Sequence, residues 1–308
     1  MSTASHQLDI QKNAPISTWF HIGGRANQLA RPNNQEDLLA CLTMDDELRV
    51  LGEGANLLVD DEGVSNLVVS LQQGAFIDTQ IDETNGIVYA GAGVALPGLI
   101  NRCVRSGLGG LEKLAGIPAT IGGAIIMNAG GAFGETSQFV TRVYAIDRVG
   151  RTHEYDRNQI DFAYRQSHLN HLIITGAVFE LEPGDRDQIA KSRAACMSYK
   201  SKSQPLGEKS AGCVFKNPTL IEPIEGIGDE GQRVSAGMLI DRAGLKGFSI
   251  RGASVSEVHA NFITTTQDAH AHDVIELIEQ VRVRVADTFG VQLQNELVIW
   301  SERAEPPS

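Results

Sequence analysis

The stretch Gly116-Ile117-Pro118-Ala119-Thr120-Ile121-Gly122-Gly123-Ala124 has neither the helical period nor the alternation of a strand. A rigid Ile-Pro step precedes a threonine and a Gly-Gly pair, so nearly all of its polar atoms are main-chain atoms. Glycine lets a backbone come close to a ligand, and successive N–H groups bind anions. The stretch therefore predicts a loop that wraps a diphosphate without adding charge, with tight structural turns as the alternative.

A second glycine loop, Gly52-Glu53-Gly54-Ala55-Asn56, comes directly after a strand predicted at Arg49–Leu51. Its glycines offer the same anion-binding backbone, and the side chain of Asn56 adds a donor. A helix predicted over Leu96–Ser106 separates the two loops, and two such loops favour a dinucleotide cofactor more than one alone. The triplet at Gly91–Gly93 lacks the third small residue of the Rossmann fingerprint, because position 96 is leucine.

The composition is that of an ordinary globular protein with a strong negative charge. The 308 residues include 26 Lys and Arg against 38 Asp and Glu, a net charge of −12, which argues against nucleic-acid binding. No stretch approaches the roughly 18 apolar residues of a membrane span, and we expect neither a secretory signal nor membrane association. The cysteines have neither zinc nor disulfide spacing, which indicates a reducing, cytoplasmic setting; they are Cys41, Cys103, Cys196 and Cys213.

Predicted strands and helices alternate without clean βαβ units, which favours an α+β fold with two or three subdomains. The clearest helix is Asp268–Phe289, which ends at Gly290; His270 and His272 near its start are expected to be solvated rather than metal ligands. The polar segment Ser201–Ser210 is the best domain boundary. Further strands are predicted at Leu57–Val59, Asn66–Leu71, Gly86–Ala90, Phe139–Asp147, His153–Asp156, Leu172–Leu181, Ser254–Ile263 and Glu296–Trp300, and further helices at Leu38–Leu42, Gln188–Tyr199 and Val234–Ala243.

Three single residues are candidate catalytic groups. Small residues before Cys213 expose its thiol, which is protonated at neutral pH and can act as an acid; a buried core cysteine is the alternative. Arg165 lies beside Tyr164, and its guanidinium can grip a carboxylate by two bonds or form a structural ion pair. Glu296 interrupts an apolar strand, so its carboxylate points into a site or faces solvent by simple alternation.

Together these segments resemble one family, the UDP-N-acetylenolpyruvoylglucosamine reductases, flavoenzymes that make UDP-N-acetylmuramate for peptidoglycan. The resemblance runs nearly from end to end, in family order, and favours the functional interpretation of both loops and of the three candidate residues. The motifs are TWFHIGG (Thr18–Gly24), GEGANLL (Gly52–Leu58), GIPATIGGA (Gly116–Ala124), NAGG (Asn128–Gly131), YRQS (Tyr164–Ser167), AGCVFKNP (Ala211–Pro218), AGMLIDRAGLKG (Ala236–Gly247), SEVHANFI (Ser256–Ile263) and QNEL (Gln294–Leu297).

The resemblance implies a three-domain α+β fold. The first part of the FAD-binding region comprises residues 1–70 and 296–308, the second part comprises 71–202, and a substrate-binding domain comprises 203–295. The FAD-binding part is expected to be similar to that of the vanillyl-alcohol-oxidase flavoproteins. About 48 residues separate Arg165 from Cys213. That short spacing is similar to the family's second type, which lacks an inserted tyrosine-bearing substrate loop.

The resemblance also implies the reaction. NADPH reduces FAD, and hydride then passes from flavin N5 to the methylene carbon of UDP-N-acetylglucosamine enolpyruvate. Arg165 and Glu296 hold and polarise the substrate carboxylate while Cys213 donates a proton; many members have serine there, and a thiol is the stronger acid. The implied cofactor-binding residues are Gly52, Glu53, Gly54, Ala55, Asn56, Leu57, Gly116, Ile117, Pro118, Ala119, Thr120, Gly122, Gly123 and Ala124, and the implied substrate-binding residues are Tyr164, Lys200, Lys202, Asn217 and Asn261. The protein is expected to be a monomer.

Two rival functions stay open. The first is a flavin oxidase of the same broad fold, although the region Gly91–Gly134 contains no histidine that could tether a flavin covalently. The second is a non-catalytic flavin or sugar-nucleotide sensor, for which cysteine at position 213 is the argument. Covalent flavin would favour the oxidase, and tight substrate binding without NADPH turnover would favour the sensor.

Overall fold

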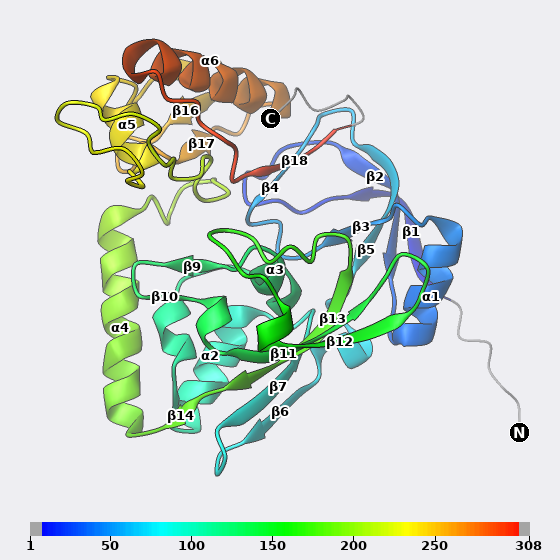
Figure 1. Ribbon diagram of the computed structural model, residues 1–308. Helices are drawn as coiled ribbons and strands as arrows, with labels where there is room; N and C mark the ends of the chain where they lie inside the picture. The colour runs from blue at the N-terminus through cyan, green and yellow to red at the C-terminus, as the bar shows by residue number, and fades with distance from the viewer. Residues whose placement is uncertain (1–7, 302–308) are drawn as a thin grey trace, which may run out of the picture. The chain divides into compact units, whose positions relative to one another are not determined.

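The computed structural model describes residues 8–301, which divide into two compact units (Figure 1). The first unit is formed within Met1–Ala14, Ala26–Glu53 and Ser65–Tyr199, and the second within Pro15–Arg25, Gly54–Val64 and Lys200–Ser308. Each unit has its own hydrophobic core. The expected three-domain division stays a prediction, and its first part includes residues 1–7 and 302–308, which lie outside the described residues.

Two sheets form the framework of the first unit. One has the strand order β1-β2-β5-β3, and the other is an antiparallel sheet in the order β12-β11-β13-β7-β6. Their strands are β1 (Asp9–Pro15), β2 (Arg25–Arg31), β3 (Arg49–Leu51), β5 (Val64–Ser70), β6 (Thr79–Asp82), β7 (Ile87–Gly91), β11 (Val140–Ile146), β12 (Thr152–Asp156) and β13 (Ile173–Glu180). Two short antiparallel pairs join β8 (Leu108–Gly109) to β14 (Glu182–Pro183) and β9 (Gly130–Gly131) to β10 (Gly134–Glu135).

The helices α1 (Gln35–Met44) and α2 (Leu96–Arg105) confirm two sequence predictions. The predicted apolar face of α2 is buried, which explains why this segment is a helix that packs on the core. Gly107, just past its end, has a φ of +71°, the left-handed conformation that favours glycine after a helix. The helix α4 (Arg186–Ser203) is longer at both ends than predicted and extends into the segment taken as a boundary.

The helix α3 (Ile121–Ile126) is a correction, because the sequence around it has no helical period. Its Gly122-Gly123 pair lowers helix propensity. Tertiary contact overrides that preference, since α3 packs against β13 and β7 (Figure 1). The N–H groups of Ile121 and Gly122 donate to Val94 and Ala92 at 2.9 and 2.8 Å, so the helix start is hydrogen-bonded to the chain that follows β7.

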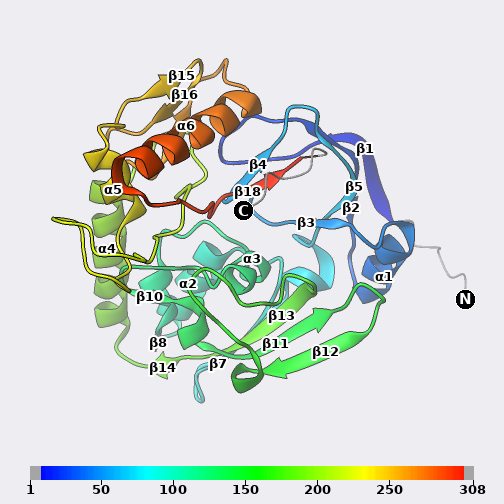
Figure 2. The ribbon, with the colours of Figure 1, turned by 45° about the horizontal axis from the view of Figure 1, so that its top comes forward.

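The second unit combines the parallel pair β4 (Leu57–Val59) and β18 (Val298–Trp300) with the sheet β15-β16-β17. Figure 2 shows α6 lying along β15 and β16. The predicted strand at Ser254–Ile263 is wrong over its middle, where turns separate β16 from β17. The remaining elements are α5 (Ala236–Arg242), β15 (Ser249–Ile250), β16 (Ala253–Val255), β17 (Ile263–Thr265) and α6 (Ala271–Phe289).

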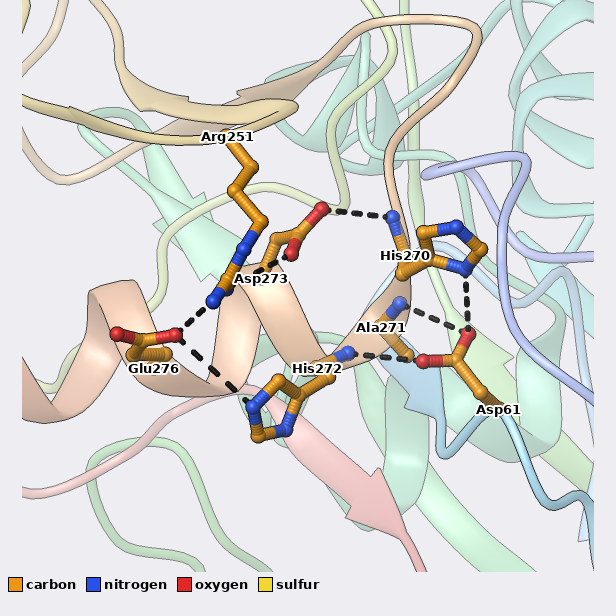
Figure 3. A network of polar contacts seen from close by, with 7 residues as sticks. All are labelled: Asp61, Arg251, His270, Ala271, His272, Asp273 and Glu276. Carbon is orange, nitrogen blue, oxygen red and sulfur yellow. Dashed lines mark hydrogen bonds and ion pairs between the residues drawn. The ribbon is translucent and has the colours of Figure 1, made fainter.

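The helix α6 starts three residues later than predicted, and Asp61 from the loop between β4 and β5 covers its N-terminus (Figure 3). The Asp61 carboxylate accepts hydrogen bonds from the N–H groups of Ala271 and His272, both at 3.0 Å. The N–H of His270 donates to the carboxylate of Asp273, also at 3.0 Å. The side chains of the two histidines are exposed, as predicted, and residues 8–301 contain no group of three or more potential metal ligands.

Residues 8–301 also contain no helix with the length and apolar composition needed to cross a membrane.

Candidate active site

The Gly52–Asn56 loop begins where β3 ends. A Cβ at position 52 would lie 2.8 Å from the hydroxyl of Thr120, so glycine brings this loop close to the second glycine loop. Gly54 has a φ of +64°, and its carbonyl accepts a hydrogen bond from the N–H of Trp19 at 3.1 Å. Within residues 8–301, the N–H groups of Glu53, Gly54 and Ala55 have no hydrogen-bond partner. Successive N–H groups of this kind form an anion-binding concavity.

The second glycine loop, Gly116–Thr120, leads into α3. Thr120 caps the helix, since its hydroxyl accepts from the N–H of Gly123 at 3.2 Å. Together with the bonds that start α3, this leaves the helix N-terminus without a spare donor for a ligand. In this second loop, the N–H groups of Gly116, Ala119 and Thr120 have no hydrogen-bond partner among the described residues. The prediction of a loop with an available main chain therefore applies to the residues before the helix.

Asn56 has a contact that the sequence did not indicate. Its side-chain amide donates to the carbonyl of Glu296 at 3.0 Å, and its own carbonyl accepts from the N–H of Val298 at 3.1 Å. The parallel pairing of Leu57 with Val298 continues this contact into β4 and β18. Asn56 thus holds the backbone that carries the candidate catalytic carboxylate, and its role toward a cofactor stays a prediction.

Within the second unit, Cys213 and Glu296 are brought together through Val214. The carbonyl of Val214 accepts hydrogen bonds from the N–H groups of Glu296 at 2.8 Å and Leu297 at 3.2 Å. The backbone one residue after the thiol-bearing residue is therefore hydrogen-bonded to the backbone of the carboxylate-bearing residue. Both Cys213 and Glu296 are half-buried, which agrees with neither the fully buried cysteine nor the fully solvated glutamate of the alternative interpretations.

Asn261 is hydrogen-bonded to the two residues that follow Cys213. Its amide nitrogen donates to the carbonyl of Phe215 at 2.8 Å, and its side-chain oxygen accepts from the N–H of Phe215 at 2.9 Å. Its carbonyl also accepts from the N–H of Val214 at 2.9 Å. With only 3% of its surface exposed, Asn261 supports the segment after Cys213 from within, and a contact with substrate stays a prediction.

His259 is a supporting residue that sequence analysis missed. Its Nδ1 accepts from the N–H of Asn261 at 3.2 Å, and its ring packs edge-on against Phe262 with the ring centroids 4.9 Å apart. Burial lowers the pKa of the His259 imidazole below its ordinary value, so the neutral ring is favoured. A neutral ring that accepts at Nδ1 keeps its proton on Nε2.

Three other predicted substrate-binding residues belong to the second unit, and their surroundings differ. The side-chain oxygen of Asn217 accepts from the N–H of Ala236 at 3.0 Å, at the start of α5. Lys200 is buried with 8% of its surface exposed, whereas Lys202 is exposed, although both lie in the last turn of α4. The two lysines, which the sequence does not distinguish, therefore differ in burial.

Arg165 and Tyr164 occupy the tip of a tight turn in the first unit. The N–H and carbonyl groups of Ala163 and Gln166 bond to each other at 2.9 and 3.2 Å and close the turn. Arg165 has a φ of +59°, unusual for a residue other than glycine, and its guanidinium carbon lies 5.2 Å from the centroid of the Tyr164 ring. Strained backbone of this kind is common at functional sites. Because Arg165 belongs to one unit and Cys213 to the other, their meeting around one substrate stays a prediction.

Comparison with known proteins identifies the family. Residues 204–300 match the family model described as UDP-N-acetylenolpyruvoylglucosamine reductase, C-terminal domain, and residues 26–156 match the model described as FAD binding domain. The α+β class is thereby confirmed, with a flavin-binding region and a C-terminal reductase region.

Full-length relatives extend this match over nearly the whole chain. UDP-N-acetylenolpyruvoylglucosamine reductase from Heliobacterium modesticaldum is 42% identical over 287 residues, which cover 91% of this chain and 86% of that protein. The enzyme of the same name from Moorella thermoacetica is 39% identical, covering 96% and 95% of the two chains. The crystal structure of UDP-N-acetylenolpyruvylglucosamine reductase from Thermus caldophilus superimposes with a TM-score of 0.79 at 35% identity, covering 96% of this chain and 99% of that one. This chain therefore belongs to the UDP-N-acetylenolpyruvoylglucosamine reductase family.

Proposed function

We propose that this chain catalyses the NADPH-dependent, FAD-mediated reduction of UDP-N-acetylglucosamine enolpyruvate to UDP-N-acetylmuramate, a step of peptidoglycan precursor synthesis. The observation that carries the proposal is the junction at Val214, which ties the segment of the Cys213 thiol to that of the Glu296 carboxylate. An acid next to a carboxylate-positioning group is what a reaction needs when negative charge develops beside a substrate carboxylate.

The residues of the two glycine loops fit FAD. Each loop presents three main-chain N–H groups that the protein itself does not use, at Glu53–Ala55 and at Gly116, Ala119 and Thr120. Main-chain donors bind a diphosphate in a protein of net charge −12 without a local cluster of cations. The proposed holding residues are the fourteen predicted ones, from Gly52–Leu57 and from Gly116–Ala124 without Ile121. Bound FAD supplies the hydride chemistry.

The chain's own residues supply positioning and a proton. The Arg165 guanidinium binds the substrate carboxylate by two charge-assisted hydrogen bonds, and Glu296 orients and polarises the same group. The Sγ–H of Cys213 delivers a proton to the carbon next to that carboxylate, which completes the reduction begun at the methylene carbon. We assign the sugar nucleotide to Tyr164, Lys200, Lys202, Asn217 and Asn261.

We further propose that the enzyme works in the cytoplasm as a monomer, with NADPH as its reductant. The four cysteines have neither zinc nor disulfide spacing, which supports a reducing compartment.

An anaerobic absorbance titration tests the proposed cycle. The purified protein is scanned for a flavin band, reduced with NADPH, and then given the enolpyruvyl sugar nucleotide. Bleaching by NADPH and recovery on adding substrate are expected. A band that bleaches and does not recover would favour the oxidase or the sensor, and the lack of a flavin band even after adding FAD would contradict the cofactor assignment.

Two variants of Cys213 test the proton donor in the same titration. Cys213→Ser is expected to remain active, because a hydroxyl can still donate a proton, and Cys213→Ala is expected to lose most turnover. The control is internal: bleaching of Cys213→Ala by NADPH should be unchanged, because the proton is needed only when substrate is reduced. Equal turnover by wild type and Cys213→Ala would refute the assignment.

A further inference from the structure

Asn128 stands at a position where glycine is the ordinary residue. It follows the last turn of α3 with a φ of +40°. Its N–H donates to the carbonyl of Ile125 at 3.1 Å, and the N–H of Ala129 donates to the carbonyl of Ala124 at 2.8 Å. These two bonds form the Schellman motif that ends many helices, in which the left-handed residue is usually glycine. An asparagine in this conformation carries backbone strain that glycine would avoid, so we expect an interaction of its side chain to account for asparagine at this position.

The side chain of Asn128 uses both ends of its amide inside the protein. Its nitrogen donates to the carbonyl of Ala163 at 3.0 Å, and its oxygen accepts from the N–H of Ser137 at 3.0 Å. Asn128 is completely buried, so water does not compete for these bonds. A buried amide that is hydrogen-bonded at both its nitrogen and its oxygen fixes the separation of the segments that it joins.

The segment held by Asn128 is the turn that carries Arg165. Ala163 is the first residue of that turn, and Ser167 follows its last residue. Ser167 is also completely buried, and both its N–H and its hydroxyl donate to the carbonyl of Ile126 at 3.1 Å. The end of α3 therefore holds the turn on both sides, at Ala163 through Asn128 and at Ser167 directly.

Because α3 starts at the second glycine loop, one short helix links the proposed flavin loop to the Arg165 turn within the first unit. We propose that Asn128 is a positioning residue: its side chain sets the place of the Arg165 guanidinium relative to the Gly116–Thr120 loop. This inference builds on the role of Arg165 in the proposed function. Small displacements of a group that holds a reacting substrate reduce the rate strongly, since a shift of about 1 Å can cost about 100-fold.

The variant Asn128→Gly separates the side chain from the backbone cap. Glycine keeps the left-handed cap and relieves its strain, which offsets part of the stability lost with the two hydrogen bonds. We expect the protein to fold, to bind FAD and to be bleached by NADPH as the wild type is. We expect kcat for the enolpyruvyl substrate to fall about tenfold or more. Asn13→Gly is the matched control, because Asn13 is an exposed asparagine with a φ of +47° in β1, and it should leave kcat unchanged.

A double-mutant cycle with Arg165→Ala distinguishes positioning from a general structural effect. If Asn128 acts through Arg165, Asn128→Gly should reduce kcat little or not at all once Arg165 is alanine. Additive losses in kcat, or an unchanged kcat in Asn128→Gly, would overturn the inference. An Arg165→Ala variant with wild-type kcat would instead contradict the proposed function of Arg165, so the two failures are distinguishable. Asn128→Asp gives a further check, because it keeps the acceptor for Ser137 and places an oxygen against the Ala163 carbonyl, so its kcat should also fall.

Discussion

Replacing Asp61 by alanine should destabilise the N-terminus of α6 by about 2 kcal/mol. The Asp61 carboxylate accepts two main-chain hydrogen bonds at 3.0 Å, from Ala271 and His272, and no other side chain within residues 8–301 accepts from these two N–H groups. Loss of a helix-capping acceptor costs about 0.5–2 kcal/mol, and loss of a negative charge at a helix N-terminus costs about 0.3–1 kcal/mol more. Asp61→Asn keeps one acceptor without the charge, so we expect about half the effect.

Hydrogen–deuterium exchange of the α6 peptides measures this locally, which matters because two units need not unfold in one step. A loss of about 2 kcal/mol corresponds to exchange roughly 20- to 30-fold faster where α6 opens independently, since about 1.4 kcal/mol is one factor of ten. Asp268→Ala is the control, because it removes an exposed carboxylate just before the same helix. Unchanged exchange in Asp61→Ala, or equal acceleration in Asp268→Ala, would refute the capping argument. The gap between wild type and Asp61→Asn should also narrow in 1 M salt, which screens the charge.

Three further outcomes follow from individual contacts. Gly93→Ala should lower the free energy of unfolding, measured in urea, by at least about 2 kcal/mol, because the new Cβ would lie 1.8 Å from a backbone oxygen. Gly98→Ala should instead raise the free energy of unfolding by about 0.5–1 kcal/mol, because a Cβ at this position in α2 meets no atom within 4 Å and alanine is the better helix former. Burial alone would raise the pKa of the Asp273 carboxyl, but the His270 N–H and the Arg251 guanidinium outweigh burial and lower that pKa. Asp273 therefore contributes stability above about pH 4, and this stability is lost as the pH falls through the lowered pKa. Asp273→Asn should therefore destabilise the protein at pH 7 and change little near pH 2, as measured by urea unfolding at both values. Burial raises the pKa of Cys103 to about 12, so mass spectrometry after alkylation of the native protein at pH 8 should find half-buried Cys213 modified and Cys103 unmodified until the protein is unfolded.

Local patterns were sufficient for the long elements of the fold. The apolar stripes of α2 and α6 and the glycines after them predicted both helices, because a helix that buries one face repeats its apolar residues in its own sequence. The same reasoning failed at α3, whose two glycines disfavour a helix and whose stability comes from β13 and β7. It failed again between β16 and β17, where a predicted continuous strand is divided by turns, and Asn261 in these turns is hydrogen-bonded to Phe215 in the segment after Cys213.

In the candidate site too, some features were predictable from local sequence and others depended on distant contacts. Glycine loops are visible in sequence because their chemistry lies in the main chain, and only glycine permits it. The two glycines of the Gly91–Gly93 triplet have a packing reason in the structure, because a Cβ at Gly91 or Gly93 would lie about 2 Å from a backbone oxygen. The supporting roles of Asn56, Asn128 and His259 could not be predicted, since each acts on a residue distant in the chain or across a turn.

The sequence by itself determined the family, the α+β class, the two glycine loops and the residue types that the chemistry needs. All of these can be recognised from short contiguous motifs. Only the tertiary structure decided that Glu296 is held by Asn56, 240 positions earlier, and joined to Cys213 through Val214. Only the tertiary structure decided that the Arg165 turn is held by the end of α3. The physical reason is that hydrogen bonds between distant segments depend on where folding places the two backbones, and no local pattern records that distance.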